Sequence, residues 1–574
     1  MAKLSLPLSP PLSFLSVVLA ALGLTLCFPK PSLYPLVFLT LIPFYLVLFG
    51  QSPKGAFLWG FIFGLTLSLS SVYWLAKVMA GYGGLGTWGG TLVLVLLSAF
   101  LALYQAIFGY LVAKMRAFSC KGTKLLILAS LFWVGLDWLK NYIFTGFNWT
   151  PLAAPLGAAP RLLGLADILG VYGLGFFIAL INFSLAELII SLWTRKPAPL
   201  EAQKAALGPF ARALKFARAN SSPLALLVFS FTLICAYGAI SYSIYAKKES
   251  ALSTKEIAVL QASVEQEYKW DSLFRDEILG RYTRLAKIAA NKRPFLIVWP
   301  ETAAPFAYGT DYHETLWLNN LLAEIKLPML VGLTYEDESP TGYKLHNRAW
   351  LLYPDGTRGP YYDKKHLVPF GEFVPLIDSL PFLRSAFLQG VLGAAGNFSP
   401  GEDYPPIEYQ SITFGPAICF ESIFPYLIRE QAAGGAQVIL VTTNDAWFGT
   451  SYAPDQHFNL AVGRAVEVRK PILRAANNGL SGLILASGKV FARSRLNELS
   501  VFFYPVPIGE KTLTLFVRGG YLFAPLCGIF TVLSFFFLWF KRNGKEPLTE
   551  LNTSAKKQKR SAPARKGKKE PKKR

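Results

Sequence analysis

The chain has 574 residues, of which 53% are hydrophobic, and it carries a formal net charge of +22 at pH 7. This composition excludes an ordinary soluble protein and indicates a membrane protein. Much of the positive charge lies in a Lys-rich tail, residues 541–574, and in loops between apolar segments. That placement favours a solvated tail close to anionic lipid over a nucleic-acid-binding region.

Eight apolar segments are long enough to cross a bilayer, which takes about 20 residues of helix. We expect the first to be retained, because the small residues of a signal-peptide cleavage site are missing after it and more apolar segments follow at once. In chain order the segments are 10–28, 32–49, 55–76, 90–113, 124–141, 167–193, 223–245 and 519–540.

Lys and Arg residues predict how these segments are oriented. If the eight segments alternate, the basic loops at 113–124 and 194–222 lie on the same side as the tail, and the positive-inside rule makes that side the cytoplasm. Both termini are then cytoplasmic, and residues 247–518 lie in the periplasm of a bacterium. Two outer loops rich in Gly and aromatic residues, 77–90 and 141–167, either line an entrance for lipid or are ordinary interfacial loops.

The long outer segment has the pattern of an α/β domain. Short apolar runs predict buried strands, and two stretches with apolar residues at helical spacing predict helices at 270–292 and 454–477. The strands are expected within 256–261, 295–300, 328–334, 347–356, 412–420, 437–444 and 481–488. We therefore expect a transmembrane domain of seven helices (1–246), a periplasmic domain (247–518), an eighth transmembrane helix (519–540) and a basic, disordered cytoplasmic tail (541–574).

Cys419 is the only cysteine of the outer segment, so no disulfide is expected there. A lone thiol in an oxidising compartment is either buried and inert or reactive. Cys419 stands between a strand and a predicted helix, and a helix N-terminus favours the thiolate, which is the nucleophilic form.

Acid–base partners for this thiol are predicted at two other strand ends. Glu301 follows a buried apolar run, where burial is expected to raise its pKa for general-base work. Lys364, Lys365 and Glu372 lie in a loop rich in aromatic residues, Pro and Gly, where an ammonium group can stabilise an oxyanion. Each also has a structural interpretation as a helix-start carboxylate, a surface charge or a loop ion pair. The four histidines, His313, His346, His366 and His457, lack metal-ligand spacing, and no metal is expected.

Four motifs in chain order carry a resemblance to a known family: "WPETAAP" (299–305), "YDKKHLVPFGEFVP" (362–375), "ICFES" (418–422) and "TTNDAWFG" (442–449). Together they resemble the nitrilase superfamily, which implies an α-β-β-α fold and a Glu-Lys-Cys triad. With the polytopic N-terminal half, the whole chain resembles the apolipoprotein N-acyltransferase family.

This resemblance implies a role for individual residues. Glu301 would be the general base, Lys364 the oxyanion-stabilising lysine and Cys419 the nucleophile. Glu372 and Glu421 match further acidic positions, while Phe420 stands where the family often has tyrosine, so the hydroxyl of that position is absent. Trp270 and Trp447 match aromatic positions near the active site and are candidates for substrate binding or for core packing.

The implied reaction is the N-acylation of the diacylglyceryl-cysteine of an apolipoprotein, the last step of lipoprotein maturation. The acyl chain would come from a membrane phospholipid through a thioester on Cys419, without a cofactor or a nucleic-acid partner, and a monomer is expected. Two alternatives stay open: a membrane-tethered amidase that uses the same three residues on small amides, and a catalytically inactive lipid-binding or transport protein. Asp137 and Glu187 are the main ionisable residues that such a transporter would offer inside the apolar segments.

Overall fold

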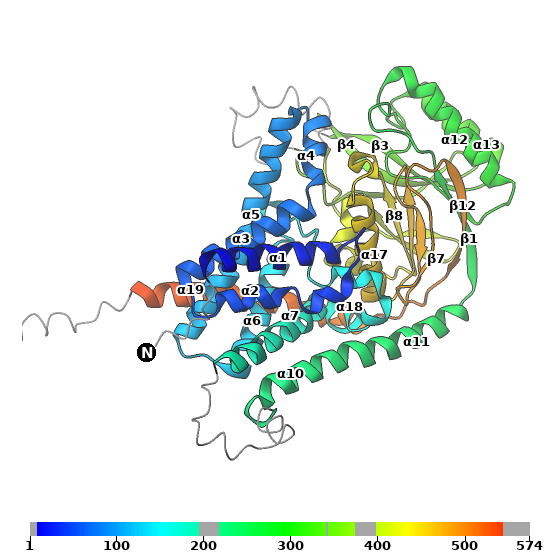
Figure 1. Cartoon of the computed structure of the whole chain (residues 1–574). Helices are drawn as coiled ribbons and strands as arrows, with labels where there is room; N and C mark the ends of the chain where they lie inside the picture. Colours follow the sequence, from blue (N-terminus) through cyan, green and yellow to red (C-terminus); the bar gives the residue numbers. More distant parts are fainter. Residues whose placement is uncertain (1–8, 195–216, 340–341, 374–397, 544–574) are drawn as a thin grey trace, which may run out of the picture.

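The computed structural model describes residues 9–194, 217–339, 342–373 and 398–543. The predicted tail from residue 544 onward and most of the second basic loop lie outside these ranges. Within them, six helices are long and apolar enough to cross a membrane, and they pack beside an α/β domain (Figure 1). The helices are α1 (Pro10–Cys27), α5 (Gly86–Ala117), α6 (Gly122–Leu139), α7 (Ala166–Trp193), the run Ser221–Ser250 that contains α10 (Ser221–Thr232) and α11 (Gly238–Ser250), and the run Gly520–Phe540 that lies largely in α19 (Phe523–Asn543).

The predicted segment 32–49 is not one long helix. It forms a short 3-10 turn, η1 (Tyr34–Phe38), and the eight-residue helix α2 (Leu41–Leu48). The fully buried Asn182 side chain of α7 supports the break, because it accepts a hydrogen bond from the Leu41 amide at 2.9 Å and donates one to the Val37 carbonyl at 2.9 Å. A buried amide that satisfies free backbone groups makes such an interruption tolerable inside a membrane domain.

The predicted segment 55–76 is bent. Helices α3 (Pro53–Ser71) and α4 (Trp74–Gly81) meet at 61°, so together they count as one further span. The Ser71 hydroxyl donates back to the Leu67 carbonyl at 2.6 Å, a local bond of the kind that bends helices. The polytopic helical domain is thus as expected, and the described residues contain up to seven spans of full length together with the shorter apolar segment Tyr34–Leu48.

The α/β domain consists of two six-stranded sheets. One has the order β12-β1-β2-β3-β4-β5 and the other β11-β10-β9-β8-β7-β6. The strands of the first are β1 (Thr254–Gln261), β2 (Leu296–Val298), β3 (Met329–Ser339), β4 (Gly342–Leu352), β5 (Arg358–Asp363) and β12 (Ser500–Pro507). Those of the second are β6 (Ile407–Tyr409), β7 (Ile412–Ile418), β8 (Val438–Thr443), β9 (Ile472–Ala476), β10 (Gly482–Ile484) and β11 (Val490–Arg493).

The two sheets pack face to face, and helices cover both outer faces. Along β1, Ile257 and Val259 join an apolar core shared with Leu440 of β8, whereas Ala258 and Leu260 face the other way. This alternation is what a strand covered on both faces requires. Helices α12 (Arg275–Ala290) and α13 (Tyr312–Ile325) cover the first sheet, and α16 (Pro425–Ala433) and α17 (Ala453–Val468) cover the second, which gives the expected α-β-β-α layering.

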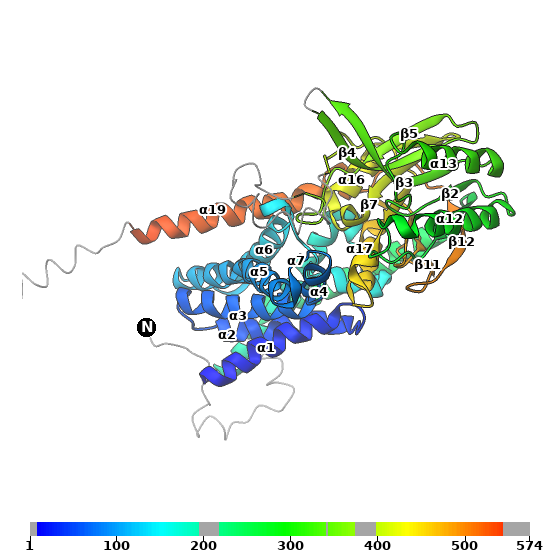
Figure 2. The same cartoon turned by 90° about the horizontal axis from the view of Figure 1, so that it is seen from above.

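Helix α17 lies between the second sheet and the membrane helices (Figure 2). Its Gln456 side chain crosses the boundary: the carbonyl oxygen accepts from the indole N–H of Trp149 at 2.7 Å and of Trp74 at 3.2 Å, and the amide donates to the Ser71 carbonyl at 3.1 Å. One buried amide therefore connects the α/β domain to the bend between α3 and α4 and to the loop after α6.

Replacing Gln456 by Leu is expected to destabilise the protein by about 2 to 4 kcal/mol, because it leaves two buried indole N–H groups without an acceptor. Thermal unfolding of the purified protein in detergent measures this. Gln431→Leu is the matched control, since Gln431 is equally buried and its amide has no partner among the described residues. The control is expected to be neutral or stabilising, and equal losses in the two variants would contradict the assigned role of Gln456.

Candidate active site

Cys419 stands directly after β7, at the first position of the short 3-10 turn η7 (Cys419–Ile423). Its backbone has φ = 54°, in the left-handed region that non-glycine residues rarely adopt. The Cys419 carbonyl accepts a hydrogen bond from the Ser422 hydroxyl at 2.8 Å and lies 3.1 Å from Nε2 of the buried His457. These contacts over-determine a strained conformation, as is common for residues at functional sites.

His457 itself belongs to a fully buried network behind the nucleophile. Its Nδ1 lies 3.0 Å from Asp445 Oδ1, and Asp445 is paired with Arg474 at 2.8 Å. The arrangement explains this histidine as a support for the Cys419 backbone.

Glu301 lies three residues after β2 and is 6% exposed. Its Oε1 accepts from the Lys364 ammonium at 3.0 Å and from the Asn347 amide at 2.8 Å, while its Oε2 accepts from the Asn444 backbone N–H at 2.9 Å. These three donors occupy three of the about four lone-pair positions of the carboxylate and fix its orientation, while about one position stays open to accept a proton.

Lys364 follows β5 and is almost completely buried. Its ammonium bridges the carboxylates of Glu301 and Glu372, at 3.0 Å and 2.9 Å. Burial acts to lower the pKa of Lys364, but these two carboxylates outweigh it and raise the pKa above its usual value. Lys365 points elsewhere and donates to the Glu402 carbonyl at 2.6 Å.

Glu421 and Phe420 flank the nucleophile in different ways. Glu421 is fully buried and accepts from the backbone N–H groups of Ile418, Lys365 and His366 and from the Tyr362 hydroxyl, at 2.7 to 3.0 Å. It therefore ties the nucleophile turn to the loop that carries Lys364. The Phe420 ring stacks on Phe147 and Trp149 of the membrane domain, with ring centroids 6.3 and 6.4 Å apart.

Trp270 and Trp447, the other predicted site residues, are not core tryptophans. Trp270 is 50% exposed. Trp447 is partly buried and packs edge-on against Tyr82, just after α4, with centroids 5.1 Å apart. Trp447 thus lies where the α/β domain meets the membrane domain, and a substrate-binding role for either tryptophan stays a prediction.

The ionisation expected from the sequence is wrong for both Cys419 and Glu301. Burial raises the pKa of the Cys419 thiol, and Glu301 raises it further while Lys364 opposes the rise. The five-residue η7 turn offers no long helix dipole, because α16 begins only at Pro425. Burial also acts to raise the pKa of Glu301, but Lys364 and Lys269 outweigh it, so this pKa lies below its ordinary value. The resting site therefore holds a neutral thiol beside an ionised carboxylate.

Three polar residues of the site were not predicted from the sequence: Lys269, Asn347 and Asn444. Asn347 donates to both Glu301 and Glu372, at 2.8 and 2.9 Å, and Asn444 fixes the second oxygen of Glu301. Asn347 sits inside a predicted strand, where nothing distinguishes it from a surface polar residue. Asn444 could have been found, since it directly follows a buried strand in the "TTND" motif.

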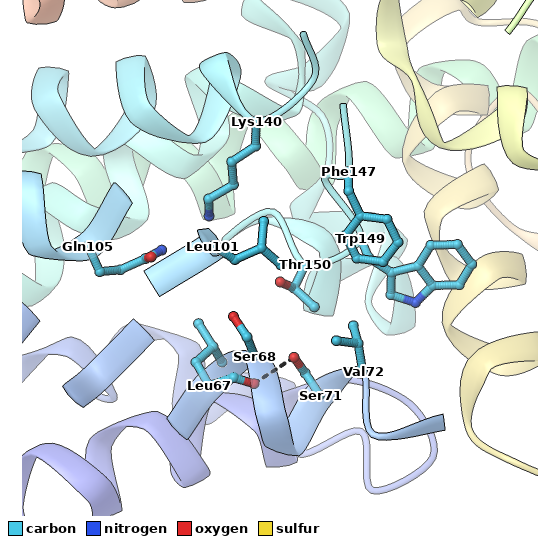
Figure 3. Close-up of a pocket in the computed structure, with 10 residues that line it drawn as sticks. All are labelled: Leu67, Ser68, Ser71, Val72, Leu101, Gln105, Lys140, Phe147, Trp149 and Thr150. Atoms are coloured by element: carbon cyan, nitrogen blue, oxygen red, sulfur yellow. Dashed lines mark hydrogen bonds between the residues drawn. The ribbon is translucent and has the colours of Figure 1, made fainter. Parts of the chain in front are cut away.

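A small cavity lies in the membrane domain, and Phe147 and Trp149, the rings that pack on Phe420, are among the residues that line it (Figure 3). Lys140, Gln105 and the hydroxyls of Ser68 and Ser71 point toward it. Asp137, flagged above as a possible transport residue, instead pairs with Lys140 at 2.8 Å and accepts from the Leu152 amide at 3.2 Å. The ion pair thus holds the loop that presents Phe147 and Trp149. Glu187, the second such residue, lies 4.0 Å from Arg116.

One group of described residues has the spacing of metal ligands: Asp337, His346 and Asp363. The Arg348 guanidinium bonds both carboxylates, at 3.0 Å to Asp337 and 2.7 Å to Asp363. A cation at this position would face a fixed positive charge, so the arrangement fits an ion-pair network better than a metal site.

Comparison with known protein families separates the chain into the same two parts. A model of the apolipoprotein N-acyltransferase N-terminal domain matches residues 20–184, and a carbon-nitrogen hydrolase model matches residues 256–510. Among solved structures, the chain is similar to Saccharomyces cerevisiae Nit3 of the nitrilase superfamily, at 22% identity over 45% of this chain and 91% of that one, with a TM-score of 0.34.

Relatives of full length are also found. An apolipoprotein N-acyltransferase of Geobacter metallireducens is 35% identical over 90% of this chain and 94% of its own length. One of Haemophilus influenzae is 29% identical over 87% of this chain and 90% of its own length. The chain therefore belongs to the apolipoprotein N-acyltransferase family.

Proposed function

We propose that this chain N-acylates lipoproteins at the membrane surface, in two steps and through a thioester on Cys419. The acyltransferase activity follows from its family. The observation that carries the mechanism is the environment of the nucleophile. Cys419 is buried and interacts electrostatically with Glu301 and Lys364, which pair at 3.0 Å, while the next residue, Phe420, packs on aromatic rings of the membrane domain. A thiol at this junction favours an ester of a membrane lipid over a small diffusing amide.

In the first step Glu301 takes the thiol proton as the sulfur attacks the acyl carbonyl of a phospholipid. An S–C bond forms, and Lys364 stabilises the oxyanion of the tetrahedral intermediate. The ester C–O bond then breaks, and the proton held by Glu301 goes to the leaving lysophospholipid oxygen. Because the resting thiol is neutral, the carboxylate has to accept its proton during attack.

In the second step the α-amine of the diacylglyceryl-cysteine attacks the thioester. An N–C bond forms, the C–S bond breaks, and the proton lost by the amine returns to the sulfur through Glu301. Two transfers by one nucleophile replace a single difficult acyl exchange between two lipids. Glu372 and Asn347 keep Lys364 and Glu301 in place through both steps.

We place residues 247–518 in the periplasm and both termini in the cytoplasm. The basic loops 113–124 and 194–222 and the Lys-rich tail support this orientation. Helix α11 ends at Ser250, just before β1 begins at Thr254, and α19 follows the domain, so both helices leave it toward the membrane. If both termini lie on the same side, the chain crosses the membrane an even number of times. The short helices of Tyr34–Leu48 would then form the eighth crossing. Since one chain supplies all three catalytic side chains, we expect a monomer.

Incubation with a phospholipid that carries a labelled acyl chain tests the donor and the intermediate. We expect a hydroxylamine-sensitive label on the proteolytic peptide that contains Cys419. A protein that binds the lipid in detergent but never becomes labelled would rule out the acyl-enzyme and favour a lipid-binding role.

A further inference from the structure

Lys269 is a buried cation that the mechanism above leaves unused. It is 3% exposed, although its neighbours Tyr268 and Trp270 are 42% and 50% exposed. Its ammonium donates to the Thr302 hydroxyl at 2.5 Å and to the Glu301 carbonyl at 3.3 Å. A lysine turned inward onto the backbone of the general base is costly to bury and calls for a specific role.

The backbone that Lys269 holds is strained. Thr302 has φ = 42°, in the left-handed region that a β-branched residue strongly disfavours. The turn is also confined from its other side, because a Cβ atom on Gly332 would lie 2.1 Å from the Pro300 carbonyl oxygen. The two contacts of Lys269 therefore help to fix the turn that aims the Glu301 carboxylate.

Charge gives Lys269 a second role. The buried cluster around the sulfur contains two carboxylates, Glu301 and Glu372, and Lys364 neutralises only one of them. Lys269 acts electrostatically on both Glu301 and Cys419, and burial outweighs both partners and lowers its own pKa to about 8, so it is largely protonated at neutral pH. With Lys269 the cluster is neutral, and it stays neutral when a proton moves from the sulfur to Glu301.

Other titratable groups that face the cluster are already compensated. Asp445 is paired with Arg474 at 2.8 Å, and the Glu421 carboxyl receives three backbone N–H groups and the Tyr362 hydroxyl. Burial and the nearby Lys364 lower the pKa of His366 to about 4, so this histidine is uncharged. Glu265 and Glu267, on the segment of Lys269, are exposed to solvent.

We propose that Lys269 is a positioning residue of the acyl transfer, which fixes the Glu301–Thr302 turn and supplies the positive charge that makes an anionic sulfur at Cys419 accessible. The inference rests on the proposed roles of Cys419 and Glu301. The test measures the reactivity of the Cys419 thiol and not acyl transfer. The role of Lys269 can therefore be disproved while the acyltransferase mechanism stands, and the mechanism can be disproved while the role of Lys269 stands.

The experiment follows alkylation of Cys419 by iodoacetamide against pH in the full chain, read by mass spectrometry of the Cys419 peptide. Lys269→Gln keeps a donor for the Thr302 hydroxyl and removes the charge. We expect the midpoint of its pH profile to rise by about one unit or more, the order expected for losing a unit charge that acts on the sulfur inside a buried site. Lys269→Arg, which keeps the charge, is expected to keep the midpoint within a few tenths of a unit of wild type.

Lys470→Met is the matched control. Lys470 is a second buried lysine of the α/β domain, and its ammonium donates to the backbone carbonyls of Glu510 and Thr512 rather than to residues of the site. We expect this variant to lose stability without a shift of the midpoint. An unchanged midpoint in Lys269→Gln, or an equal shift in Lys269→Arg or Lys470→Met, would overturn the proposal. If Lys269→Gln does not fold, the double variant Lys269→Met, Glu372→Gln takes its place, because removing one positive and one negative charge keeps the cluster neutral. A midpoint one unit or more above wild type in this double variant would also overturn the proposal.

Discussion

Cys419→Ala is expected to abolish the labelled acyl adduct and to reduce lipoprotein N-acylation to background, because no other described group can take over as nucleophile at the Glu301–Lys364 pair. The sulfur contributes the bond through which both half-reactions pass. Labelled phospholipid and an acceptor lipopeptide, followed in parallel, measure the two effects. The substitution shortens the side chain by one atom at a position that is 8% exposed, so the fold is expected to survive.

Cys235→Ala is the control for this experiment, since Cys235 lies in the membrane-spanning run Ser221–Ser250. That variant is expected to form the adduct as wild type does. Normal product formation by Cys419→Ala would show that acyl transfer proceeds without a thioester on this residue.

Glu301→Gln is expected to slow adduct formation by about 10²- to 10⁴-fold, the usual contribution of a general base. The amide is isosteric but cannot accept the thiol proton. It also places an N–H₂ group against either the Asn444 N–H or the Lys364 ammonium, so we expect a loss of about 1 to 3 kcal/mol in stability as well. Single-turnover labelling measures the rate, and thermal unfolding measures the stability.

Glu249→Gln separates the two effects. Glu249 is another buried carboxylate, which accepts from the Ser487 N–H at 3.0 Å and the Ser487 hydroxyl at 2.8 Å, away from the site. Its substitution is expected to cost stability and to leave the labelling rate intact. If Glu301→Gln labelled at the wild-type rate, another group would have to be the base.

Local sequence patterns predicted the strands of the α/β domain well where both faces of the strand are buried, because such strands are continuous apolar runs. The pattern failed at residues 454–477, predicted as one helix. There α17 ends at Val468, Arg469 adopts φ = 51°, and β9 begins at Ile472 after Pro471. The proline was the available signal, since the residue before a proline disfavours the helical conformation. In the membrane domain, the break at η1 and α2 depends on Asn182, about 140 residues away in sequence, and no local pattern contains that contact.

The sequence predicted which residues form the candidate site but not their protonation states. Motifs gave Glu301, Lys364 and Cys419, yet their ionisation depends on how many charges share one buried space. Lys269 shows why: beside the aromatic residues of "EYKWD" it reads as a surface lysine, and only the folded chain turns it inward onto Glu301. The Cys419 thiol is neutral because it is buried next to the charge of Glu301. An argument from its position before a predicted helix takes neither the burial nor that charge into account.

The most direct test of the account is a chase of the acyl-enzyme. Wild-type protein is first labelled on Cys419 from phospholipid, freed of excess donor, and then mixed either with a diacylglyceryl-cysteine peptide or with buffer alone. We expect the label to leave Cys419 rapidly with the peptide and to appear in equal amount as N-acyl peptide, and to persist in buffer. Loss of the label at the same rate in buffer, with free fatty acid as the product, would contradict a transferase and identify a hydrolase.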